Sequence, residues 1–219
     1  MGINRLLGLI CLSLFSFNGF AQNHTIGFGL GGAAFKGETS DDFESIVEEI
    51  GVHSHLYYAL ALKDSRWQLM AQLNYNRIQA DIDINSVKGQ LISYRTSSQH
   101  LFTSAGLRFY FDSYTRKYQP RFGHSAPFLG AHIGGTFFTN ETNSPIFNTE
   151  DNINVKDGAF RDLAFQVEAG YRFYLNKSWS VEANANFRHG TNDLWDGIGG
   201  HTEFNDWIVS LSIGFAINL

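Results

Sequence analysis

The chain has almost no cysteine and very little proline. Of its 219 residues, one is cysteine and three are proline. Cys11 lies in an apolar stretch near the N-terminus and follows Ile10, where a lipoprotein signal needs a small residue. Once a leader containing Cys11 is removed, no thiol remains, which excludes a disulfide framework and a thiolate metal site. The prolines fall in connections or at a strand start, where they remove no ladder hydrogen bond: Pro120, Pro127 and Pro145.

Long apolar runs and an excess of positive charge are also missing. No segment reaches about 18 consecutive apolar residues, so the sequence predicts no transmembrane helix. The net charge is −5, which gives no support to nucleic-acid binding by a basic face. The apolar stretch at 6–17 follows Arg5 and precedes Gly19 and Ala21. We therefore expect a secretory signal peptide over 1–21, with an uncleaved anchor as the alternative, and one domain over 22–219.

Aromatic residues and alternating patterns are abundant instead. Aromatics make up 15% of the chain, and Phe alone counts 20. Apolar residues recur at every second position, which is the period of a β-strand and not of a helix. Eight segments show this pattern, and we expect a strand in each: 24–36, 51–62, 67–77, 99–111, 128–138, 163–174, 179–189 and 207–219.

The connections between these strands differ in length according to their order. Those after the first, third, fifth and seventh strands are long, those after the second and sixth are short, and 112–126 is intermediate. An even number of strands, each about long enough to cross a bilayer when tilted, is typical of outer-membrane barrels. The sequence therefore predicts an all-β fold, an eight-stranded antiparallel transmembrane β-barrel with long outer loops and mostly short periplasmic turns. Aromatic residues near strand ends on the apolar face fit interfacial anchors: Trp67, Tyr75, Trp179 and Trp207.

Charged residues that lie within the predicted strands and away from their ends all fall on the polar face. On the lipid face an Arg at mid-bilayer costs about 2–4 kcal/mol, so we expect these side chains to form a charge network in the lumen. In the hairpin of the sixth and seventh strands, pairing Leu175 with Trp179 places Arg172 opposite Glu182. The predicted lumen network consists of Arg108, Glu168, Arg172, Glu182 and Arg188.

A soluble lipocalin-like barrel or sandwich is the alternative fold. It would turn the apolar faces inward and place the polar faces in water. Those polar faces carry few lysines, whereas a soluble exterior usually carries scattered charge. Most acidic residues lie in the predicted outer loops, where they could bind the divalent cations that bridge lipopolysaccharide. Solvated acidic loops are the simpler interpretation, because no spacing resembles a calcium loop.

The lumen offers little catalytic chemistry. An eight-stranded barrel encloses only enough space for its own side chains, so we expect no diffusion pore. His53 and His55 share a face, but without a third ligand they favour a hydrogen-bonded pair over a metal site. His100 and Ser104 also share a face, which leaves a lipid A-modifying enzyme as an alternative. No nucleophile motif is present, so the sequence predicts a non-enzymatic protein without a cofactor.

The inner connection after the fourth strand reads DSYTRKYQPRFGHSA and is long for a periplasmic turn. It interleaves bases with aromatic residues, and Arg and aromatics are favoured at protein interfaces. It is therefore a candidate docking surface for a periplasmic partner. A solvated loop whose bases face lipid headgroups is the alternative. The candidate residues are Tyr114, Arg116, Lys117, Tyr118, Arg121 and Phe122.

Four stretches in order together resemble the PorG-type outer-membrane barrels of the type IX secretion system of Bacteroidetes. They are GFGLGGAAFKGE, LISYRTSSQHLFTSAGLRFYF, APFLGAHIGGTFFTN and GYRFYLNKSWSVEANANFRHGTNDLWDGIGG. The last one contains Asp193, Trp195 and Asp196, where the family carries a T-D-Y-L-D-D-like signature; this chain has one acid where the family tends to carry two. The resemblance implies a non-enzymatic outer-membrane component that associates with periplasmic ring proteins of the PorK and PorN type.

Overall fold

A computed structural model of the chain describes residues 21–36, 50–62, 65–85, 91–111, 123–142, 154–155, 158–191, 195, 198–199 and 206–219. The predicted leader, except Ala21, lies outside these residues. No helix among the described residues is long and apolar enough to cross a membrane. The strands are β1 Ala21–Lys36, β2 Gly51–Leu62, β3 Trp67–Asn85, β4 Leu91–Tyr110, β5 Ser125–Thr142, β6 Asn154–Val155, β7 Gly158–Tyr174, β8 Trp179–Gly190, β9 Ile198–Gly199 and β10 Trp207–Asn218.

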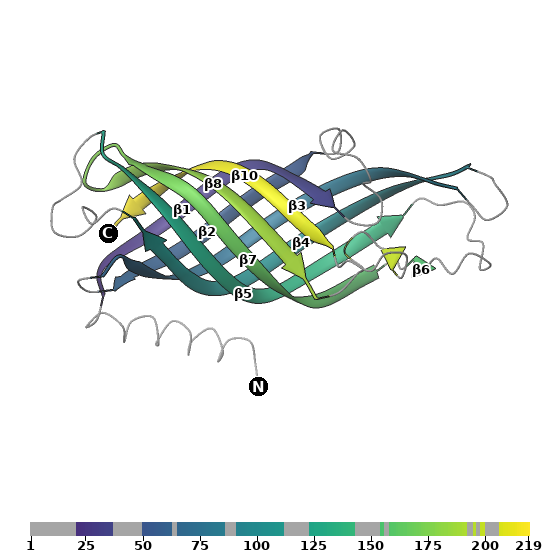
Figure 1. The fold of residues 1–219 in the computed structure, drawn as a ribbon, viewed down its shortest axis with the longest axis horizontal. Helices are drawn as coiled ribbons and strands as arrows, with labels where there is room; N and C mark the ends of the chain where they lie inside the picture. The colour runs from purple at the N-terminus through teal and green to yellow at the C-terminus, as the bar shows by residue number, and fades with distance from the viewer. Residues whose placement is uncertain are drawn as a thin grey trace.

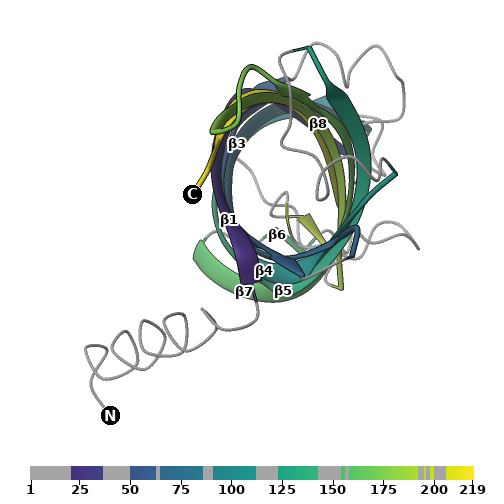
Figure 2. The ribbon, with the colours of Figure 1, turned by 90° about the vertical axis from the view of Figure 1, so that its left-hand side faces the viewer.

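Eight of these strands form one closed antiparallel barrel, in the order β1-β10-β8-β7-β5-β4-β3-β2. Figure 1 shows the strands tilted across the barrel, and Figure 2 looks along it. The sheet closes where β1 pairs with β10, from Thr25 opposite Asn218 to Lys36 opposite Trp207. The predicted fold class is confirmed. The two remaining strands, β6 and β9, pair with each other outside the barrel, and the sequence pattern did not predict them.

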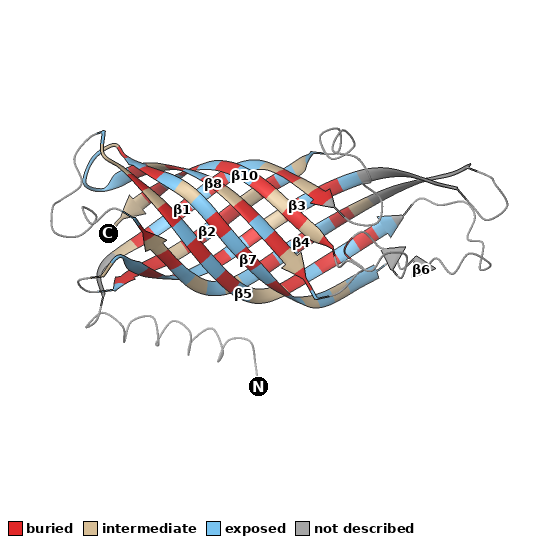
Figure 3. Cartoon of the chain, in the orientation of Figure 1, coloured by how far each residue is buried: buried red, intermediate tan, exposed pale blue. Residues whose placement is uncertain are grey.

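The burial pattern decides between the transmembrane and the soluble interpretation. Along each barrel strand, buried and exposed residues alternate, which appears as alternating red and blue bands in Figure 3. Large apolar side chains form the exposed set; Leu211 and Ile213 of β10 are 63% and 67% exposed. Polar side chains face the lumen. The soluble alternative is wrong, because the apolar faces point outward, as they do in a barrel surrounded by lipid.

The two ends of the barrel differ. We name them the turn end, where residues 62–67 and 174–179 join neighbouring strands, and the loop end, which lies opposite. At the turn end, the Asn176 side chain accepts hydrogen bonds from the amides of Ser178 and Trp179, both at 2.8 Å. A short polar side chain that satisfies two backbone amides fixes a tight reversal of the chain.

Several strands run further at the loop end than the sequence pattern predicts. The connection predicted at 78–98 is mostly strand, because β3 and β4 remain paired from Trp67 opposite Phe109 to Asn85 opposite Leu91. The same two strands project beyond their neighbours in Figure 1. A hairpin beyond the wall needs only its ladder hydrogen bonds and no apolar face. The apolar alternation in the sequence therefore stops before the strands β3 and β4 end.

Glycines on the lumen face make room for large side chains on the neighbouring strand. Gly29 of β1 lies opposite His55 of β2, and Gly130 of β5 lies opposite Glu168 of β7. In each pair the larger side chain lies over the glycine, and a Cβ atom there would overlap it. Glycine is required at these positions because the other side chain approaches the backbone closely. The glycine-rich first strand thus serves lumen packing.

Candidate functional site

The centre of the lumen is an ion-pair network of four side chains from three strands, β4, β7 and β8. Arg108 of β4 makes a bidentate pair with Glu168 of β7, with Nε to Oε1 at 2.7 Å and Nη2 to Oε2 at 3.1 Å. Its Nη1 also reaches Glu182 of β8 at 3.3 Å. Glu182 in turn accepts a hydrogen bond from Nε of Arg172. The structure thus brings Arg172 and Glu182 together across the β7–β8 hairpin, as the expected register requires.

Aromatic rings and hydroxyl groups complete this network. The Arg108 guanidinium lies over the rings of Phe128 and Tyr57, 4.0 Å and 4.7 Å from their centroids. Arg172 donates to the Tyr57 hydroxyl at 2.9 Å, and Arg108 donates to the Tyr110 hydroxyl at 3.3 Å. A buried charge is tolerated only when partners replace its lost hydration. Ion pairs, hydroxyls and ring faces provide those partners here.

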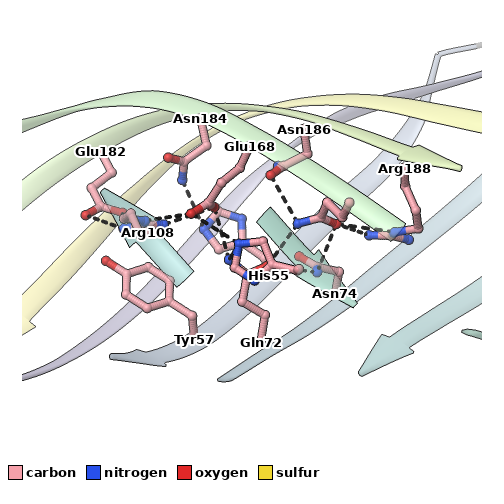
Figure 4. Close-up of polar contacts among 12 residues, drawn as sticks. His55, Tyr57, Gln72, Asn74, Arg108, Glu168, Glu182, Asn184, Asn186 and Arg188 are labelled. Carbon is pink, nitrogen blue, oxygen red and sulfur yellow. Dashed lines mark hydrogen bonds and ion pairs between the residues drawn. The ribbon is translucent and has the colours of Figure 1, made fainter. Parts of the chain in front are cut away.

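A chain of amides links this centre to the loop end. Gln72 donates to Oε2 of Glu168 at 3.0 Å, and its own carbonyl accepts from Gln166 at 2.9 Å. The Gln166 carbonyl accepts from Nη2 of Arg188, also at 2.9 Å. Figure 4 shows Arg188 lying apart from Glu168 and Glu182. The five predicted network residues all face the lumen, but among the described residues Arg188 has no carboxylate partner. It joins the others only through amides.

Trp195 closes the lumen at the loop end. It is fully buried, and it packs in one apolar cluster with Phe102 and Ile208. Its amide donates to Asp206, its ring nitrogen donates to Asp162, and its carbonyl accepts from a serine hydroxyl. Trp195 falls in a predicted outer loop, and no sequence pattern there predicts this inward position. The two other residues singled out in that loop, Asp193 and Asp196, lie outside the described residues.

The histidines proposed for metal binding or catalysis make other contacts. The rings of His53 and His55 lie 5.5 Å apart, and Nδ1 of His53 is 2.7 Å from the Asn76 carbonyl. Within the described ranges, no group of three or more possible metal ligands is present. His100 contacts Ser98 at 2.7 Å, not Ser104, which lies four residues along the same strand, about 13 Å away. No Ser–His dyad is therefore formed between His100 and Ser104.

The candidate docking surface falls outside the described residues. The six residues singled out there are Tyr114, Arg116, Lys117, Tyr118, Arg121 and Phe122. At its borders, Phe111 and Gly123 are described, and Gly123 adopts a positive φ of 83°. Sequence reasoning also missed Tyr57, Gln72 and Gln166, whose only signal was their place on the polar face of a strand.

Comparison with known proteins supports the fold and no finer statement. No family model matches the chain, and no curated protein matches it. Neisserial surface protein A has a similar structure, with a TM-score of 0.52 and 11% identity over 89% of this chain and 96% of that one. The attachment invasion locus protein Ail of Yersinia pestis gives 0.50 and 9%, over 90% and 98%. The chain is therefore similar in architecture to small outer-membrane β-barrels, and its resemblance to PorG-type barrels stays a prediction.

Proposed function

We propose that this protein is a non-enzymatic outer-membrane barrel that anchors long surface loops, a structural or adhesion barrel of the small OmpX type. The observation that carries the proposal is the combination of an apolar outer wall with a lumen filled by paired polar side chains. Such a lumen leaves no continuous path for a substrate or a diffusing solute. The apolar wall favours contact with outer-membrane lipid and lipopolysaccharide, which leaves the loop end for interactions outside the cell.

Cysteine labelling on intact cells tests this placement. Ala159 at the start of β7 and Ser178 in the turn after it are both exposed and lie at opposite ends of the barrel. A membrane-impermeant maleimide should label an Ala159→Cys variant on intact cells. It should label Ser178→Cys only after the outer membrane is permeabilised. The unmodified chain is the control for Cys11. Labelling of both variants on intact cells, or recovery of the protein in the soluble fraction, would contradict the proposal.

Shortening one outer connection separates adhesion from a purely structural role. Residues 143–153 can be replaced by a short Gly-Ser turn, which leaves all eight barrel strands intact. If the loops bind an external surface, cells with the short-loop variant no longer attach to that surface. Their envelope stays impermeable to large antibiotics. If the barrel serves the envelope itself, deletion of the gene makes the envelope leaky and the short-loop variant restores it. A gene deletion that changes neither property would contradict both roles.

A second candidate function is an accessory or scaffold subunit of type IX secretion. It is supported by the order of the four stretches that resemble PorG-type barrels and by the basic, aromatic connection at 112–122. On this proposal the connection docks periplasmic ring proteins. Photocrosslinking in cells from position 118, followed by mass spectrometry, should then yield adducts to periplasmic or lipoprotein ring components. Adducts to lipid alone, with a barrel-wall site as the lipid control, would reject this role.

A further inference from the structure

Arg188 is a fully buried cation whose charge is not balanced locally. Its side chain is about 1% exposed, and its Nη1 has no hydrogen-bond partner. Its Nε and Nη2 both donate to one neutral acceptor, the carbonyl of Gln166. Asp206 is also buried, and its carboxylate accepts a hydrogen bond from the Trp195 amide. Among the described residues, no ion pair joins Arg188 to a carboxylate.

The guanidinium reaches across the lumen to a set of polar atoms that also lack partners. It lies over the ring of Phe102 on β4, 4.2 Å from the centroid, although Arg188 itself is on β8. On that side of the barrel, His53, Asn76 and His100 occupy paired positions on β2, β3 and β4. His100 lies two residues from Phe102 on the same buried face of β4. Nη1 of Arg188 and Nδ2 of Asn76 are therefore two permanent donors without acceptors in one part of the lumen.

The surroundings make this charge costly to leave unbalanced. Phe102, Ile78 and Ile208 belong to the apolar cluster around this part of the lumen, and Trp195 covers it from the loop end. His100 lies against Trp195, with ring centroids 5.4 Å apart. In such a low-dielectric setting a guanidinium needs a counter-charge or a full set of acceptors. Gln166 supplies one acceptor and no charge.

We propose that the outer part of the lumen holds one small monovalent anion, such as chloride, bound by Nη1 of Arg188 and Nδ2 of Asn76. One negative charge matches Arg188, which among the described residues is the fully buried arginine without a carboxylate partner. The ion must be small, because the side chains around Arg188 are closely packed. The imidazole of His53, which contacts Asn76, borders the same space and can donate through Nε2 when it carries a proton there.

Bromide is a direct probe, because it replaces chloride and scatters anomalously. Crystals of the wild-type barrel grown in sodium bromide should show an anomalous peak within hydrogen-bonding distance of Arg188 Nη1 and Asn76 Nδ2. Density there without an anomalous signal would identify water and overturn the proposal. This measurement needs no variant, so a substitution that prevents folding cannot leave the question open.

Thermal unfolding in detergent gives the matching solution test. A ligand that binds only the folded state raises its unfolding temperature. At equal ionic strength, the wild type should unfold several degrees higher in sodium chloride than in sodium gluconate, whose anion is too large to enter. Arg188→Met should lose this difference, whereas Arg161→Met, which removes an exposed arginine on the outer wall, should keep it. An equal response of the wild type and Arg188→Met would mean a general salt effect and no site.

Discussion

At the scale of single residues, Glu182 is a lumen carboxylate that two arginines share. It pairs with both Arg172 and Arg108, whereas Glu168 pairs with Arg108 and also lies 3.3 Å from His132. Removing one member of a buried pair costs about 3–5 kcal/mol, because it leaves an uncompensated charge. We expect Glu182→Gln to reduce the free energy of unfolding by this amount. Glu168→Gln should cost less, because Arg108 keeps Glu182. Urea unfolding of the barrel in lipid vesicles measures both.

A double-mutant cycle is the control for this prediction. If Arg172 is destabilising only when it is unpaired, adding Arg172→Met to Glu182→Gln should recover part of the lost stability. Strictly additive losses, or a larger loss for Glu168→Gln than for Glu182→Gln, would show that the network does not work as the distances imply.

At the scale of elements, each strand presents an apolar face to the outside, and β10 offers a matched pair of positions. Ile213 lies in the middle of β10 and is 67% exposed, whereas Ile217 lies near the turn end and is half-buried. On a lipid face a Lys costs about 2–4 kcal/mol at mid-bilayer and roughly 0–1 near the interface. Ile213→Lys should therefore destabilise the barrel in vesicles far more than Ile217→Lys. Equal costs at the two positions would contradict a membrane-spanning wall.

At the scale of the whole molecule, buried side chains occupy the described lumen at both ends and in the centre. Tyr110 and Tyr174 lie at the turn end, the ion pairs in the centre and Trp195 at the loop end, all of them buried. We expect the purified barrel to produce no steady single-channel steps in planar bilayers, in contrast to a wide porin used as a positive control. Ohmic steps from the wild-type protein would show that the lumen opens and would favour a transport role.

Sequence patterns predicted the fold well because a barrel wall repeats one simple rule. β2 begins and ends at the predicted residues, and β8 runs only one residue further, since short turns or loops bound their apolar alternation. The partners inside the lumen could not be predicted in the same way. The alternation of side chains along a strand shows that Arg108 and Glu168 both point inward. They lie, however, on two strands that are separated by β5. Whether they meet depends on the stagger of the closed sheet, which only the structure supplies.

The position of Trp195 shows a similar limit. Loop residues have no periodicity from which an inward position could be read, and the aspartates that it contacts, Asp162 and Asp206, lie 33 and 11 residues away along the chain. Likewise, the alternation of side chains puts Arg188 on the same lumen face as the other charged residues and does not distinguish it from them. Its isolation from carboxylates becomes visible only once the register of four strands is known.

The pairing of β1 with β10 also has a consequence for how the protein assembles. Thr25 bonds Asn218 across a separation of 193 residues, so the seam cannot form until β10 is available. Until then β1 and β10 are both unpaired edges, which invite aggregation with other chains. Such long-range pairing makes folding slow. A chain with this seam must therefore be kept unfolded and guarded for longer than a protein built from local contacts would need, and completion of the seam marks the moment when that protection is no longer required.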